Sequence, residues 1–241
     1  MPNSNFISHT RISPNSSNPR SAQIKKITIH HCAGNPTVEQ LGEMFQPKSR
    51  QASSNYGVGT DGRIGLYVEE KNRAWTSSSA LNDNQAVTIE VANNGGAPNW
   101  TVSDKALQAT VDLCADICKR NGIGRLNFTG DANGNLTTHD MFAQTNCPGP
   151  YLRGNLPYIA EQVNTRLAAA GDAVLSAPCS TTGPDALFSE MRVFYKGKIH
   201  TVPCLFKDGY NYPNLRALAD VLGLTVGWDD TTKLIALTGG E

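Results

Sequence analysis

Apolar and polar residues alternate in the segment IKKITIHHC, residues 24–32. Ile27 and Ile29 share one face with His31, whereas His30 falls on the polar face. A period of two residues is typical of a strand that turns one face toward the core. The pattern therefore predicts a half-buried strand that runs into a functional site.

The same period returns twice farther along the chain. Residues 53–70, SSNYGVGTDGRIGLYVEE, predict two strands joined in a hairpin at residues 60–62, Thr-Asp-Gly. Residues 85–94, QAVTIEVANN, predict another strand, whose apolar side chains share one face while Glu90 falls on the other.

Helical spacing appears between these strands and after them. Thr37 is in position to cap a short helix that runs through Phe45. Ser103 is an N-cap for a longer amphipathic helix, which we expect to end near residues 121–122, Asn-Gly. Residues 155–168 predict a further helix. Strands and helices mixed in this order predict an α/β fold, with helices packed on a single sheet.

The pattern weakens after residue 167 and then resumes. Residues 168–185 are rich in small residues and have no clear period, which is typical of a linker. Residues 191–209 predict a hairpin turning at Lys196-Gly197, followed by an amphipathic helix and a second hairpin. The expected divisions are an arm, residues 1–21; a main domain, residues 22–167; a linker, residues 168–185; and a small domain, residues 186–241.

Charge and composition exclude several classes of protein. Among the 241 residues, Lys plus Arg equals Asp plus Glu at 21 each, so no net field favours nucleic acid or an anionic membrane. No apolar run is long enough to span a bilayer. The first 20 residues lack the apolar stretch of a secretory signal and predict a weakly structured arm. The six cysteines are therefore expected to be free or metal-bound.

Two potential metal ligands, His139 and Cys147, flank a short polar segment within TTHDMFAQTNCPGPYL, residues 137–152. A loop histidine and a buried thiol are the simplest interpretation. Imidazole and thiolate are also preferred ligands of zinc, whose catalytic sites take three protein ligands and leave one position open. The third ligand should then come from a rigid neighbouring strand.

His30 is the preferred third ligand, because it lies on the polar face of its strand. Cys32 shares that face and stays an alternative, whereas His31 is expected to be a core histidine. Glu90 stands in an apolar strand, where it is either exposed to solvent or placed to exchange a proton with a water at the metal. Trp75 either stacks on a sugar or peptide or packs inside the protein, and of these we favour packing.

Four stretches, in this order, resemble the type-2 N-acetylmuramoyl-L-alanine amidases: ITIHHCAG, SSNYGVGTDGRI, AVTIEVANN and LTTHDMFAQTNCPGPYL. These zinc enzymes occur in phage endolysins and bacterial autolysins, and they share their fold with peptidoglycan recognition proteins. The resemblance covers residues 22–167 and implies a mixed central sheet flanked by helices. It also implies hydrolysis of the amide between N-acetylmuramic acid and the L-alanine of the peptidoglycan stem peptide.

The resemblance assigns roles to five residues of this chain. It implies that His30, His139 and Cys147 bind Zn²⁺, that Glu90 accepts a proton, and that Thr145 contacts the developing oxyanion. Non-catalytic peptidoglycan-binding proteins of this fold usually lack the cysteine, so its presence favours an enzyme over that alternative. A structural zinc protein, with Cys32 as a fourth ligand, is a third possibility.

Two positions depart from the pattern of the family. Ser54 occupies a position where some members carry a tyrosine near the metal, and Thr76 follows Trp75 where a histidine is common. These differences leave zinc binding intact and place the proton transfer on Glu90.

Residues 189–238 resemble the small repeat domain named for the N-terminal stalk of copper amine oxidases, which many Gram-positive cell-wall proteins carry. This resemblance implies attachment to the cell envelope. Without an export signal, we expect synthesis in the cytoplasm and action at the bacterial cell wall, as for a phage lysin released through a separate membrane pore.

Overall fold

The computed structural model divides into two compact units, Met1–Ala177 and Pro178–Glu241. Within these units it describes residues 2–172, 187–195, 198–207, 210–229 and 234–238. No helix within these ranges is both long and apolar enough to cross a membrane.

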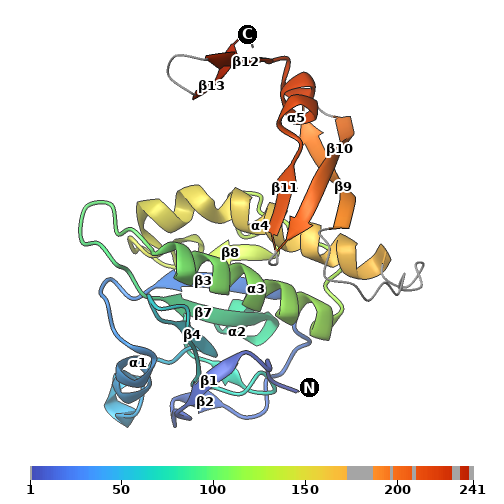
Figure 1. The fold of residues 1–241 in the computed structure, drawn as a ribbon. Coiled ribbons are helices and arrows are strands. Elements are labelled where there is room, and N and C mark those ends of the chain that lie inside the picture. The colour runs from blue at the N-terminus through green and yellow to red at the C-terminus, as the bar shows by residue number, and fades with distance from the viewer. Residues whose placement is uncertain (1, 173–186, 196–197, 208–209, 230–233, 239–241) are drawn as a thin grey trace. The chain divides into compact units, whose positions relative to one another are not determined.

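The first unit is built on a six-stranded sheet (Figure 1). Most neighbouring strands are parallel, and the predicted hairpin supplies an antiparallel pair. This arrangement confirms the α/β fold with a mixed central sheet. In spatial order the strands are β1 (Ile7–Thr10), β5 (Ile64–Leu66), β4 (Tyr56–Val58), β7 (Ala86–Val91), β3 (Lys26–His31) and β8 (Leu136–Thr138).

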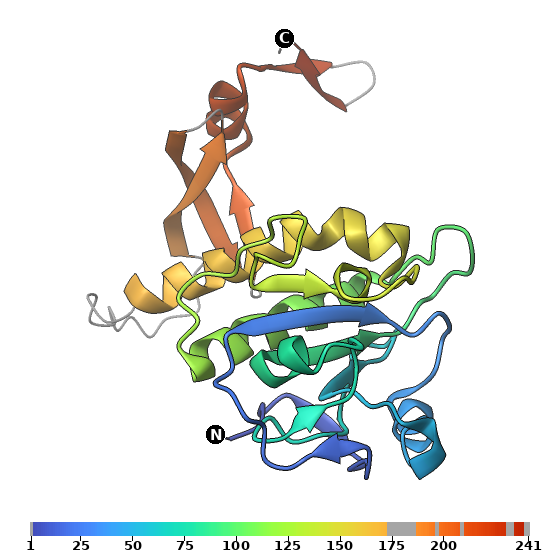
Figure 2. The same ribbon diagram turned by 180° about the vertical axis from the view of Figure 1, so that it is seen from behind.

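Helices cover both faces of this sheet, as the two opposite views show (Figures 1 and 2). The long helix α3 (Asp104–Asn121) lies on one face, and α2 (Ala80–Gln85) lies on the other. The N-cap of α3 is Ser103 and its C-cap is Gly122, as the sequence predicts. Helix α1 (Val38–Met44) begins after Thr37, whose side chain forms a capping box with Gln40.

Helix α4 (Gly149–Asp172) is longer than predicted at both ends. It begins directly after Pro148, six residues before the predicted start at residue 155. Its buried stripe joins the main core with α3: Leu152, Leu156, Ile159 and Val163. Residues 168–172, expected to be linker, are helical, and the remainder of the expected linker lies outside the described residues.

Strand β3 is buried on both faces, which corrects the prediction of a half-buried strand. On the face that Thr28 shares with His30, the Thr28 side chain contacts Asn82 of α2 and Thr137 of the neighbouring strand β8. Thr28 Oγ1 lies 2.9 Å from Thr137 Oγ1 and accepts a hydrogen bond of 3.0 Å from Asn82 Nδ2. Because the hydroxyls of Thr28 and Thr137 are hydrogen-bonded, this polar face of β3 is buried without leaving either hydroxyl unpaired.

The N-terminal segment is part of the folded unit, although the sequence predicts a weakly structured arm. Strand β1 forms one edge of the sheet, and β2 (Ser16–Ser17) pairs with β6 (Arg73–Ala74). Ile7 packs against the core, whereas Phe6 is exposed. The buried Arg20 side chain donates hydrogen bonds to five backbone carbonyls, those of Glu70, Asn72, Asp83, Asn84 and Ala86.

The second unit has the predicted hairpin, helix and hairpin in that order, and a further strand, β11, that was not predicted. A three-stranded antiparallel sheet comes first, then a helix capped by Asn214 and Gly223, and then a hairpin. The predicted turn at 196–197 lies outside the described residues. The elements are β9 (Leu187–Tyr195), β10 (Lys198–Lys207), β11 (Tyr210–Pro213), α5 (Leu215–Leu222), β12 (Thr225–Asp229) and β13 (Leu234–Thr238).

Candidate metal centre and the pocket beside it

Three side chains converge at the carboxyl-terminal edge of the parallel strands. His30 lies near the end of β3, His139 opens the short helix η2 (His139–Met141) after β8, and Cys147 precedes α4. Their potential ligand atoms all lie within 4.8 Å of one another. Because β3 and β8 are parallel neighbours, their carboxyl ends meet at one edge, which brings residues 109 positions apart together.

The spacing of two of these atoms matches what zinc requires. Zinc binds nitrogen at about 2.0–2.1 Å and sulfur at about 2.3 Å. At a tetrahedral angle, these bond lengths place a nitrogen ligand and a sulfur ligand about 3.6 Å apart. Cys147 Sγ lies 3.6 Å from His30 Nδ1. Two nitrogens and one sulfur are also the donor types that zinc prefers, so these residues fit the metal.

The environment keeps both histidines in the form that binds a metal. Burial, followed by the proximity of His139 and His31, lowers the pKa of His30 well below its usual value. Burial also lowers the pKa of His139, against the opposing charge of Asp83. Neutral imidazole is the ligand form of histidine, so no proton has to be displaced from either ring.

Cys147 is held in place by its own loop. Burial and the nearby Glu90 raise the pKa of its thiol, whereas the backbone N–H of His31, which donates to Sγ at 3.4 Å, lowers it. The Cys147 backbone N–H donates to Thr145 Oγ1 at 3.2 Å. The Cys147 carbonyl accepts from the Asp140 backbone N–H at 3.2 Å, which ties the thiol to the histidine loop.

Glu90 occupies the strand position next to His30, since the two residues are paired in the register of β3 and β7. Burial raises the pKa of its carboxyl to about 8, although the charge of Arg50 and a hydrogen bond with Cys32 oppose this shift. Its Oε2 atom is shielded and has no hydrogen-bond partner. This carboxyl can therefore gain and lose a proton near neutral pH.

Two other residues of the same strand end lie outside the cluster. Among the described residues, the potential ligand set contains His30, His139 and Cys147 but neither Cys32 nor His31. Burial, with Glu90 and Cys147 nearby, raises the pKa of the Cys32 thiol. The His31 ring packs edge-on against Trp100, with centroids 5.5 Å apart, as expected for a core histidine.

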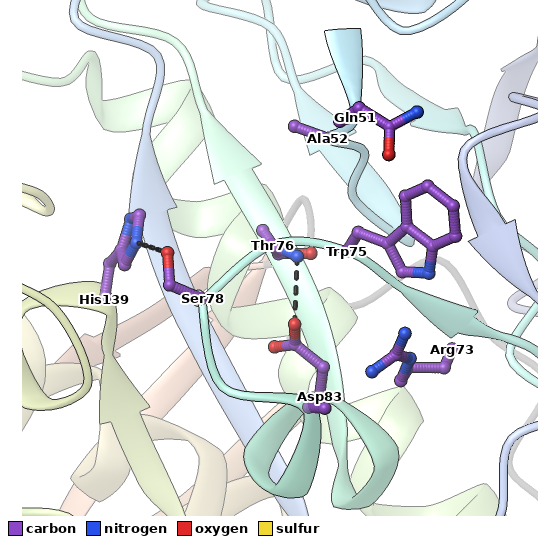
Figure 3. A pocket seen from close by; sticks show the side chains of 9 residues that line it. Gln51, Ala52, Arg73, Trp75, Thr76, Ser78, Asp83 and His139 are labelled. Atoms are coloured by element: carbon purple, nitrogen blue, oxygen red, sulfur yellow. Dashed lines mark hydrogen bonds between the residues drawn. The ribbon is translucent and has the colours of Figure 1, made fainter. Parts of the chain in front are cut away.

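A pocket of about 380 Å³ opens beside the cluster, with His139 in its wall (Figure 3). Ser78 Oγ lies 3.4 Å from His139 Nε2. The backbone of Ser78 has a φ of +63°, a strained value for a residue with a side chain. The other lining residues are Gln51, Ala52, Arg73, Trp75, Thr76, Ala80 and Asp83.

Sequence reasoning missed this pocket. Trp75, expected to be a packing residue, lines it, and its Nε1 donates a hydrogen bond of 2.9 Å to Ser17 Oγ. Asp83 shapes one wall by accepting hydrogen bonds from the backbone of Thr76 and from Ser77. The serine run before α2 signals a helix N-cap, but no local pattern reveals a pocket.

Comparison with known proteins gives a family and a set of similar folds. A family model described as N-acetylmuramoyl-L-alanine amidase (Amidase_2) matches residues 20–150, more than half of the chain. No curated protein matches the chain.

Several solved structures share the fold at low sequence identity. The hydrolase AmiA of Staphylococcus aureus, solved in complex with its ligand, is 15% identical with a TM-score of 0.54, over 68% of this chain and 84% of that chain. PlyL is 16% identical with a TM-score of 0.51, over 64% and 95% of the two chains. An AmpD derivative is 15% identical with a TM-score of 0.50, over 66% and 99%. At these identities the structures support the fold alone.

Proposed function

Because the chain belongs to the N-acetylmuramoyl-L-alanine amidase family, we propose that it is a zinc-dependent enzyme acting on peptidoglycan. The reaction is hydrolysis of the amide between N-acetylmuramic acid and the L-alanine of the stem peptide. The convergence of His30, His139 and Cys147, with a sulfur–nitrogen spacing of 3.6 Å, carries the proposal of a zinc site. We further propose that the protein is a phage endolysin or an autolysin.

Zinc, when bound, supplies a Lewis acid that polarises the amide carbonyl and lowers the pKa of water toward about 7. Glu90 removes a proton from the attacking water and delivers it to the departing amine nitrogen of L-alanine. A cation nearby favours the ionised form of this carboxyl, which suits it to accept the first proton.

Thr145 is proposed to stabilise the oxyanion. Its Oγ1 accepts a hydrogen bond from the Cys147 backbone N–H, so its own hydroxyl proton is available to donate. A donor aimed at the carbonyl oxygen is worth most when negative charge develops there.

The remainder of the chain is proposed to bind the cell wall. The division between the compact units, after Ala177, falls inside the proposed linker, residues 168–185. We propose residues 22–167 as the catalytic domain and residues 186–241 as a small domain that attaches to the envelope.

Digestion of purified Gram-positive cell walls, with and without a zinc chelator, tests the proposal. The expected products are new amino-terminal alanines, which disappear with chelator and return when zinc is added. New reducing sugar ends alone would mean that the glycan is cut and that the proposed mechanism is wrong. Sedimentation with the walls without any cleavage would instead favour a non-catalytic peptidoglycan-binding protein.

A further inference from the structure

Ser78, in the wall of the pocket beside the proposed zinc centre, holds a backbone conformation that its residue type disfavours. Its φ of +63° lies in the left-handed region, where a side chain crowds the backbone and glycine carries no such cost. Strained residues of this kind cluster at functional sites. Glycine would fit this position better, so the serine side chain is expected to contribute something that glycine cannot.

The residues on either side of Ser78 hold its backbone in place. Ser77 donates two hydrogen bonds to Asp83 Oδ1, one of 3.1 Å from its backbone N–H and one of 2.6 Å from its hydroxyl. Ser79 is the N-cap of α2. Both neighbours are thus tied to the start of this helix, which fixes the strained residue between them. The Ser78 side chain instead points toward His139 (Figure 3).

The contact between these two side chains joins Ser78 Oγ to His139 Nε2 over 3.4 Å. A neutral imidazole carries a proton on one ring nitrogen and a lone pair on the other. When Nε2 carries the proton and donates it to Ser78 Oγ, the lone pair is left on Nδ1, which is then free to bind a metal. The reverse arrangement, in which the hydroxyl donates to Nε2, leaves a proton on Nδ1 and obstructs metal binding there.

We propose that Ser78 is a positioning residue of the zinc site, whose hydroxyl accepts the Nε2 proton of His139 and so presents the Nδ1 lone pair to the metal. This inference rests on the proposed function for the identity of the metal. A histidine ligand commonly donates its second ring N–H to a carboxylate, a backbone carbonyl or a water. The carboxylate in this pocket, Asp83, accepts hydrogen bonds from Thr76 and Ser77 instead. The Ser78 hydroxyl therefore takes the place of that acceptor.

Zinc affinity, measured by competition with a chromogenic chelator, tests the role of the hydroxyl. S78A removes the hydroxyl but keeps the strained backbone, and it should bind zinc about tenfold or more weakly, as when an outer-shell partner is lost. S78G should lose as much affinity, although its zinc-free form should unfold at a higher urea concentration than that of S78A because glycine relieves the strain. A33G is the matched control, since Ala33 also has a left-handed backbone, with a φ of +50°, but no hydroxyl. A33G should keep the zinc affinity of wild type.

Nitrogen-15 NMR of the zinc-free protein, which shows the ring nitrogen of His139 that carries the proton, separates this inference from the proposed function. Wild type should carry the proton on Nε2, and S78A and S78G should shift a measurable fraction of it to Nδ1. That shift would support the role of Ser78 even if the protein bound no zinc, a result that would overturn the proposed zinc enzyme alone. Wild-type zinc affinity in either variant, or a proton distribution that does not change when the hydroxyl is removed, would overturn the positioning role.

Discussion

Cys147 is the residue on which the proposed zinc binding depends most directly, because a thiol ionises at a metal whereas a serine hydroxyl stays protonated. We expect C147S to lower zinc affinity by more than the roughly 10–100-fold loss typical of an outer-shell partner. Zinc content after dialysis against a weak chelator measures the effect.

C32S is the matched control for this substitution. Cys32 lies at the end of the same strand as His30 but outside the ligand cluster, so C32S should keep one zinc per chain. Loss of zinc from C32S would contradict the three-ligand site and favour a four-ligand structural site.

The raised pKa of Glu90 should make the free energy of unfolding of the metal-free protein depend on pH. Burial raises the pKa of Glu90 from 4.5 to about 8, so between these values the native protein holds a proton that the unfolded chain releases. Its contribution to stability is present below pH 4.5 and is lost as the pH rises through 8. Relative to wild type, E90Q should therefore gain about 1–3 kcal/mol of unfolding free energy between pH 5 and pH 8.5, less than the full shift implies because water reaches the partly exposed Glu90 and screens its charge.

Urea unfolding of both proteins in chelator, at the two pH values, measures this difference. The other titrating groups are common to wild type and E90Q, so they cancel in the comparison. A difference that does not change with pH would show that Glu90 ionises normally in the folded protein.

The three residues proposed to bind zinc could be singled out from the sequence, and the structure brings their potential ligand atoms within 4.8 Å of one another. Alternation placed His30 on the polar face of a predicted strand, whereas residue type alone pointed to His139 and Cys147, because neither β8 nor the start of α4 was predicted. Arg73 and Ser78 could not be identified in this way. Arg73 lines a pocket that is formed by segments distant in the sequence, so no local pattern marks it. Ser78 has a left-handed backbone conformation, which its residue type does not indicate.

Elements were predictable where their own residues determine them. The hairpin of β4 and β5 and the caps of α3 follow from local turn and capping residues. The predicted exposure of β3 was wrong because burial depends on α2, a helix more than 45 residues away in the sequence. The N-terminal strands were missed because the strands that pair with them, β5 and β6, lie beyond position 60.

Arg20 anchors the N-terminal segment to the rest of the first unit through side-chain hydrogen bonds. Its guanidinium donates to five carbonyls in the β5–β6 connection and around α2, so removing it leaves buried acceptors without donors. We expect R20A to lower the free energy of unfolding by about 3 kcal/mol or more. Urea denaturation measures it.

R11A is the matched control, because it tests whether removing any arginine of the N-terminal segment lowers the free energy of unfolding as much as R20A does. Arg11 forms an exposed ion pair with Glu43, 3.1 Å between Nε and Oε1, and such pairs contribute about 0–1 kcal/mol. A loss in R20A no larger than that in R11A would mean that solvent replaces the lost donors.

At the scale of the molecule, the proposed chemistry belongs to the first unit. The proposed zinc ligands, the pocket and the main hydrophobic core all lie before residue 164. A fragment ending at Asp172, where α4 ends, should therefore fold and cleave small soluble muramoyl peptides as fast as the full chain does.

The same fragment should differ from the full chain only on intact walls. A second binding unit raises the local concentration of the enzyme at an insoluble substrate, so the full chain should sediment with walls and digest them about 100-fold faster at low enzyme concentration. Comparison of wall turbidity and of soluble-peptide cleavage for the two proteins separates attachment from chemistry. If the fragment sedimented and cleared walls as well as the full chain, attachment would reside in the first unit, and the proposed role of residues 186–241 would be wrong.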